Sequence, residues 1–248
     1  MYTDSYLILH LKFFFNYTVY MKNADLYVNR NRFLYSINCK LTTLIHFKLC
    51  MIKWPLNFIL SCVLSFSASA QSWTSQQLEK ANTAKDIKHL TMMEKEVITY
   101  VNLCRLYPQL FLEYELLDYY GPEEYGDYLR NSNYRESLVN TLRVIEPTEA
   151  LYFNQRAYLS AECFAKEQGL AGDIGHTRIN CTNKAFNGEC CSYGMKSARD
   201  IVMQLLIDHN VPSLGHRKIC LDPNYKTIGV SIQPHSRWDT CAVLDLLL

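Results

Sequence analysis

Apolar residues recur at helical spacing along most of the chain after residue 90. A capping box at Thr91-Met92-Met93-Glu94 precedes the first such segment and predicts a helix over 92–106. The same signals predict later helices: a short one from Pro108 to about Tyr120, one over 137–145, one over 154–168 that ends at Gly169, and one from Ser197 that stops before Pro212. The acidic and aromatic segment 121–134 is expected to be a loop.

The period of the pattern changes near the C-terminus. Apolar residues alternate within 226–233, and 240–247 is strongly apolar, with Pro234-His235-Ser236-Arg237 between the two segments. This arrangement predicts a β-hairpin. Helices that precede a terminal hairpin, without alternating βαβ units, favour an α+β fold with an antiparallel sheet flanked by helices.

Residues 51–70 have the three regions of a secretory signal peptide. Lys53 supplies the basic residue, 54–66 forms the apolar core, and Ala68-Ser69-Ala70 is a small-x-small cleavage site. The primary prediction is therefore a secreted or periplasmic protein cleaved after Ala70. The alternative is a lipoprotein anchored through Cys62, because the residues before it loosely resemble a lipoprotein box.

The rest of the chain divides into three segments. Residues 1–50 are interpreted as a non-native or unstructured leader, since they contain no Gly, no Pro and no clear period. The alternative is a real extension whose apolar segment over 6–15 is too short to span a bilayer. Residues 71–90 are predicted to be an N-terminal linker, and 91–248 to form one domain.

The balance of charge differs between the two ends of the chain. From Gln71 onward there are 18 Lys and Arg against 22 Asp and Glu, a net charge of −4, whereas residues 1–70 carry +5. An acidic surface repels phosphate backbones, and this part of the chain has no basic run, so no nucleic-acid partner is expected. No transmembrane segment is predicted in the mature chain.

Seven cysteines follow the expected cleavage site, namely Cys104, Cys163, Cys181, Cys190, Cys191, Cys220 and Cys241. Export to an oxidising space favours disulfides, although an odd number leaves at least one thiol outside an intrachain bridge. A bond between the neighbours Cys190 and Cys191 would be strained, so one of them is expected to pair with Cys181.

The remaining four cysteines are assigned differently. Cys220 and Cys241 form the next candidate pair. Cys104 and Cys163 lie in helical patterns and are expected to be buried free thiols.

Three polar residues next to glycine are the main candidates for a functional site. They are His176 in Gly175-His176-Thr177, Glu189 in Gly188-Glu189-Cys190 and His216 in Gly215-His216-Arg217. Glycine beside a polar residue usually marks a loop, and loops on a rigid scaffold are where sites are built. The three side chains are therefore predicted to share a pocket.

These motifs, in this order, resemble those of bacterial members of the CAP superfamily of cysteine-rich secretory, antigen and pathogenesis-related proteins. The similarity covers about 92–247. It implies a three-layer α-β-α sandwich with a central cavity, where two His and two acidic residues bind divalent metal in some members. The resemblance assigns these roles to His176, His216, Glu189 and Asp208, with Zn²⁺ or another divalent metal as the cofactor.

The chain departs from the family pattern at three places. Asp208 replaces a longer Glu, and Cys190 and Cys220 stand where the family usually has Asn. Disulfides are an expected substitute for the amides in those loops. A shorter carboxylate at 208 would need its backbone closer to the cavity.

Three function classes agree with the sequence. The preferred one is a secreted CAP-like binding module whose cleft holds a metal and a lipid-like molecule or a peptide. The others are a hydrolase in which a metal activates water with Glu189 as base, and an envelope interaction protein with a vestigial cavity. The sequence leans against an enzyme, since it contains no serine nucleophile elbow, zincin motif or phosphate loop.

Structural interpretations compete with functional ones at several residues. The four cavity residues can form a buried hydrogen-bond network. His209 and His235 are expected to be structural, and Arg217 and Lys218 to lie on the solvated rim. Five tyrosines can line a ligand groove or pack loops, with packing preferred: Tyr114, Tyr119, Tyr120, Tyr125 and Tyr128.

Overall fold

The computed structural model describes 72–248, and in addition the backbone of 7–9, 18–22, 25–30 and 33–37. The chain divides into two compact units, Met1–Ser67 and Ala68–Leu248. The predicted signal peptide, its cleavage site and Cys62 lie outside the described residues.

The first unit contains a small antiparallel sheet in the segment expected to be a leader. Its strands are β1 (Leu7–Leu9), β2 (Thr18–Lys22), β3 (Asp25–Arg30) and β4 (Phe33–Ile37), and they pair in sequence order. The sequence pattern predicted no elements here, so these strands differ from the expectation.

The second unit is an α+β fold built on a four-stranded mixed sheet. Its strands are β5 (Tyr152–Phe153), β6 (Gly188–Tyr193), β7 (Thr227–His235) and β8 (Asp239–Leu247). They lie in the order β5-β7-β8-β6, with β5 parallel to β7 and the other pairs antiparallel. The predicted hairpin is confirmed as β7–β8, and the two-residue β5 makes the sheet mixed instead of wholly antiparallel.

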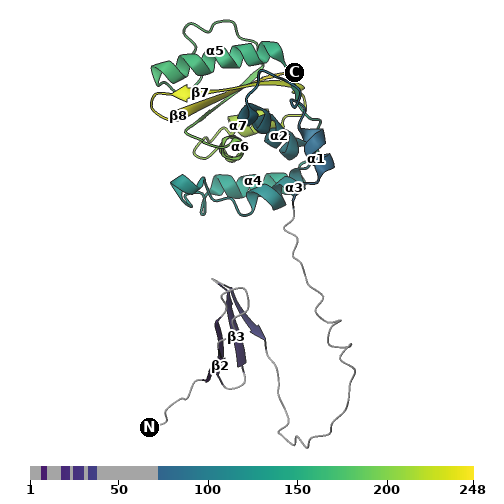
Figure 1. Cartoon of the computed structure of the whole chain (residues 1–248), viewed down its shortest axis with the longest axis vertical. Helices are drawn as coiled ribbons and strands as arrows, with labels where there is room; N and C mark the ends of the chain where they lie inside the picture. Colours follow the sequence, from purple (N-terminus) through teal and green to yellow (C-terminus); the bar gives the residue numbers. More distant parts are fainter. Residues whose placement is uncertain (1–6, 10–17, 23–24, 31–32, 38–71) are drawn as a thin grey trace, which may run out of the picture. The chain divides into compact units, whose positions relative to one another are not determined.

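Helices cover both faces of this sheet (Figure 1). α5 (Gln155–Ala171) packs on β7 and β8 on one side. On the other side, α2 (Met92–Leu106) packs on β7, while α6 (Ala198–Ile207) and α7 (Gly215–Leu221) pack on β6. α4 (Asn133–Val144) and α3 (Pro108–Phe111) lie outside α2 and α6. The π-helix η2 (Leu112–Leu116) and the 3₁₀ turn η3 (Glu123–Tyr125) follow α3.

The predicted linker contributes to the folded unit. α1 (Ser75–Ala81) lies within 71–90 and packs on α2, with Ala81 and Ala84 fully buried. Its N-terminus has a capping box between Thr74 and Gln77, which satisfies two backbone amides. The expected linker is therefore partly an element of the domain.

Glycines in α5 and β7 explain how closely these elements approach. A side chain at Gly229 would overlap the backbone of Tyr158, and one at Gly169 would overlap the carbonyl of Pro234. Gly169 is therefore inside α5 because of packing, and does not end the helix as predicted. The left-handed cap is Gly172, at φ 70°.

The structure contains one disulfide among the described cysteines, between Cys163 and Cys181. It ties the loop that follows His176 to α5. The predicted bridge from Cys181 to Cys190 or Cys191 is wrong, as is the expectation that Cys163 is a free thiol.

The predicted Cys220–Cys241 pair is also wrong, because these residues belong to separate buried clusters on opposite sides of the sheet. Cys104 is a buried free thiol, as expected.

Reducing the Cys163–Cys181 disulfide is expected to lower the free energy of unfolding by about 3 kcal/mol, because the bridge closes a loop between residues 18 positions apart. Urea unfolding with and without reductant measures this difference. Alkylation of the unreduced, denatured protein provides the control, since it should leave both cysteines unlabelled. Equal unfolding midpoints, or alkylated Cys163, would contradict the pairing.

Candidate functional site

The candidate residues meet at the free edge of β6, which is the last strand of the sheet. Alternate side chains of β6 face opposite layers. Cys191 packs with Phe164 of α5, whereas the thiol of Cys190 lies 3.8 Å from the carbonyl oxygen of His216 in α7. An edge strand therefore lets residues from both layers approach one another.

The structure brings His176 and His216 together, as the sequence predicted. Their ring centroids are 5.9 Å apart and the rings are inclined by 38°. His176 lies in the predicted loop between α5 and β6. The other two glycine motifs are not loops: Glu189 is in strand β6, and His216 is in the first turn of α7. At Gly188 the missing side chain makes room for the hydroxyl of Tyr225.

His176 is paired with Glu189. Its Nδ1 donates to the Glu189 Oε1 over 2.9 Å, and its side chain is half exposed while the carboxylate is buried. This hydrogen bond raises the pKa of His176 above its ordinary value. Burial opposes ionisation of Glu189, but hydrogen bonds from His176 and Arg178 outweigh it and lower the pKa of the carboxyl. The pair therefore favours an ionised carboxylate.

Arg178 holds this carboxylate from the other side, and the sequence analysis did not identify it. Its side chain is 1% exposed, and its Nε donates to the Glu189 Oε2 over 3.1 Å. Its Nη1 donates to the carbonyl oxygen of Ser160, and the guanidinium lies over the rings of Phe164 and Phe186. The loop that carries His176 is thus anchored by a buried cation.

Asp245 completes this buried network. It lies opposite Glu189 in the β6–β8 register, and its Oδ2 accepts from the Arg178 Nη2 over 3.1 Å. Burial raises the pKa of Asp245 to about 7, although Arg178 favours its ionised form. One guanidinium therefore serves two carboxyl groups of adjacent strands.

His216 is paired with Asp208 at the end of α6. The His216 Nδ1 donates to the Asp208 Oδ1 over 2.7 Å, and the His216 amide donates to the other carboxylate oxygen over 3.0 Å. Asp208 has a left-handed backbone, with φ 56° and ψ 44°. Its charge lies at the N-terminus of α7, where an anion is favourable.

Arg217 is buried, which corrects its predicted place on the rim. Its guanidinium donates to the carbonyl oxygens of Leu206 and Ile207, at the C-terminus of α6, and to that of Tyr134 in α4. The carbonyls of Leu206 and Ile207 are in the last turn of α6 and have no partner within that helix, so a cation satisfies them. Lys218 is exposed, as predicted.

The other two histidines examined in the sequence have structural contacts. The His235 Nδ1 accepts from the amides of Arg237 and Trp238, and its Nε2 donates to the carbonyl oxygen of Asp173. The His209 Nδ1 is 2.9 Å from the Ser132 hydroxyl. Neither belongs to the histidine pair.

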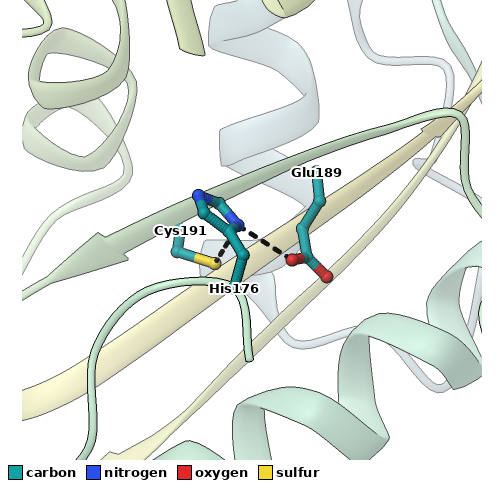
Figure 2. Close-up of side chains that lie close together, drawn as sticks. All are labelled: His176, Glu189 and Cys191. Carbon is teal, nitrogen blue, oxygen red and sulfur yellow. Dashed lines mark hydrogen bonds and ion pairs between the residues drawn. The ribbon is translucent and has the colours of Figure 1, made fainter. Parts of the chain in front are cut away.

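Cys191 is a further neighbour of His176, and the sequence analysis considered it only as a disulfide partner. Its Sγ is 3.8 Å from the His176 Nδ1 (Figure 2). Ligand atoms of His176, Glu189 and Cys191 all lie within 4.8 Å of one another, and in the described part of the chain this is the only such group of three or more that can hold a metal ion. Burial, and next the charge of Glu189, raise the pKa of the Cys191 thiol well above its ordinary value.

The same geometry does not fit a cysteine nucleophile. In a catalytic triad the thiol and the acid contact opposite nitrogens of the imidazole. Here Cys191 and Glu189 both face the Nδ1 of His176. A raised thiol pKa also disfavours the thiolate that such chemistry needs.

A cavity of about 350 Å³ opens beside His216. Its lining includes Tyr119, Tyr128, Leu129, Cys191, Tyr193, Gln204, Leu205, Ile207, Asp208, His209, Val211 and His216. A larger cavity of about 550 Å³, between Lys80 and Lys226, contains none of the candidate residues.

Two of the five predicted tyrosines, Tyr119 and Tyr128, therefore line the cavity. The other three have packing contacts: Tyr114 with Trp73, Tyr120 with Arg130, and Tyr125 through its hydroxyl with the Gly194 carbonyl.

The chain matches no family model, and no curated protein matches it. Among the described residues, no helix combines the length and the apolar content that crossing a bilayer requires.

Proposed function

We propose that the protein is a secreted CAP-like binding module whose cleft holds a divalent metal ion between His176 and His216. The observation that carries this proposal is that the two histidine rings are hydrogen-bonded in the same way. Each Nδ1 is engaged by a buried carboxylate, which leaves each Nε2 for an ion. Carboxylates that orient imidazoles in this way are typical of metal sites.

The spacing of the rings supports one shared ion. With metal–nitrogen bonds of about 2.1 Å, two imidazoles on one ion place their ring centroids roughly 5 to 6.5 Å apart. The observed separation is 5.9 Å. Two imidazoles alone hold an ion weakly, so water would have to complete its coordination shell. Nickel, zinc and copper all suit nitrogen ligands.

The neighbouring cavity supports a second ligand. Its walls combine tyrosine rings and aliphatic side chains with polar groups from Gln204, Asp208, His209 and His216. Small-molecule sites use apolar walls together with placed polar groups. A lipid-like molecule or the side chains of a peptide would fit this cavity, and an ion at His216 would lie at its wall.

A hydrolase with Glu189 as general base is less well supported. A base works best when its pKa is near the working pH. The pKa of Glu189 is lowered instead, and both its oxygens are engaged by His176 and Arg178. Secretion is supported by the Cys163–Cys181 disulfide, since such bonds persist in oxidising compartments.

Metal analysis of the purified exported protein tests the proposal. After dialysis against nickel near neutral pH, about one ion per chain is expected at the histidine pair. The ion should be lost as the pH falls, because protonated imidazoles are not ligands. Since the pKa of His176 is raised, loss should begin above the unperturbed histidine value of about 6.5. Absence of bound metal, or binding that does not change with pH, would leave a hydrogen-bond network in a vestigial cavity.

A further inference from the structure

The Nδ1 of His176 faces a second set of metal donors that does not include His216. The Glu189 Oε1 is 2.9 Å from this nitrogen and the Cys191 Sγ is 3.8 Å from it. These are a nitrogen, an oxygen and a sulfur from two segments of the chain (Figure 2). The set is distinct from the histidine pair, in which the Nε2 atoms are the ligands.

Two of the three donor separations are close to those around a tetrahedral ion, and the third, between the Glu189 carboxylate and the Cys191 Sγ, is within 4.8 Å. Bonds of about 2.0–2.1 Å to nitrogen and about 2.3 Å to sulfur place the two ligand atoms roughly 3.5 Å apart at a tetrahedral angle. The observed 3.8 Å is within a few tenths of an ångström of that spacing. The His176–Glu189 contact, now a hydrogen bond, would open by roughly half an ångström to admit an ion.

Two of the three donors are held by the strand β6. Glu189 and Cys191 are two residues apart on β6, so their side chains leave the strand on the same side. Arg178 binds the Glu189 Oε2, which leaves Oε1 directed at His176. The positive charge of Arg178 also offsets part of the negative charge that a thiolate and a carboxylate would bring.

An ion can reach these donors from solvent. The His176 side chain is 53% exposed, and Cys191 lines the cavity beside His216. The carboxylate and the thiol are themselves buried. The site would thus have an open side, where water can supply a fourth ligand.

We propose that His176 Nδ1, Glu189 Oε1 and Cys191 Sγ form a second, thiophilic metal site that takes Zn²⁺, Cd²⁺ or Cu⁺. Thiolate ligands select such ions over harder ones. On binding, the ion replaces the thiol proton, which passes to solvent, and the imidazole proton moves from Nδ1 to Nε2. Because the histidine pair needs that Nε2 free of its proton, the two sites compete for His176.

Titration with Cd²⁺ tests this site. The sample is protein whose free cysteines are kept reduced while the Cys163–Cys181 disulfide stays intact. Thiolate-to-cadmium charge transfer absorbs in the ultraviolet, and the wild type should saturate at one ion per chain. Cys191→Ser should abolish this absorption, and His176→Ala should weaken it. Cys241→Ser is the matched control, because Cys241 is a buried thiol of the same apolar cluster outside the donor set, and it should leave the titration unchanged.

His216→Ala separates the two sites. It should keep the cadmium absorption and lose nickel, whereas Cys191→Ser should lose cadmium and keep nickel. Circular dichroism and a second variant, Cys191→Ala, distinguish a lost ligand from a lost fold. No absorption in the folded wild type, absorption retained in folded Cys191→Ser, or absorption lost in His216→Ala would each overturn the thiophilic site, whatever the result with nickel.

Discussion

Replacement of Arg178 by leucine is expected to lower the free energy of unfolding by about 3–5 kcal/mol, the usual cost of removing one partner from a buried ion pair. The change leaves Glu189 and Asp245 buried next to each other without their cation. It also releases the loop of His176. Urea unfolding at neutral pH measures the loss.

Two controls make this result specific. Arg156→Leu removes an exposed arginine of α5 and should change stability by less than about 0.5 kcal/mol. Adding Asp245→Asn to Arg178→Leu should recover part of the loss, because one of the two buried carboxylates is then neutral. The loss should also shrink as the pH falls and the carboxyl groups take up protons. A loss below about 1 kcal/mol at neutral pH would show that the guanidinium is not the anchor of this network.

His176→Ala and His216→Ala are each expected to weaken nickel binding by at least about 100-fold while the fold is retained, because either change leaves a single imidazole. Asp208→Asn should weaken it less, by about 10- to 100-fold, since it removes only the group that orients His216. Calorimetric titration of the folded variants measures these affinities.

His89→Ala is the matched control for the histidine variants. His89 is exposed and contacts the rings of Phe153 and Tyr158, away from the pair, so its loss should leave nickel binding unchanged. Equal affinity in all three alanine variants would contradict a shared ion.

Local signals in the sequence were sufficient for most of the elements. The capping box at Thr91 begins α2 where the pattern placed it, and the alternation in 226–233 marks β7. These signals depend on residues only a few positions apart. The α+β class follows from their order along the chain.

The sequence offered less indication of which distant segments would come into contact. His176 and His216 were grouped through the order of motifs and a family resemblance, since nothing local brings together residues 40 positions apart. Arg178 was not identified because its partners lie on other elements. Asp245 did offer a signal, as a lone acidic residue in the apolar run that forms β8, where a charge must be buried with a partner.

The glycines were misinterpreted for a different physical reason. Gly169 and Gly188 were taken as marks of a helix end and a loop, but both are required by close packing against other elements. The disulfide was missed because Cys163 and Cys181 become neighbours only when the loop after His176 folds back on α5. In each case the cause is tertiary and has no local pattern.

Anomalous scattering from a crystal of the protein soaked in nickel, recorded on both sides of the nickel absorption edge, tests the central claim most directly. The account predicts one strong peak within bonding distance of the Nε2 atoms of both His176 and His216, with Glu189 and Asp208 still hydrogen-bonded to the opposite nitrogens. A peak bonded to only one of the two rings, or none while the rings keep their present positions, would contradict it.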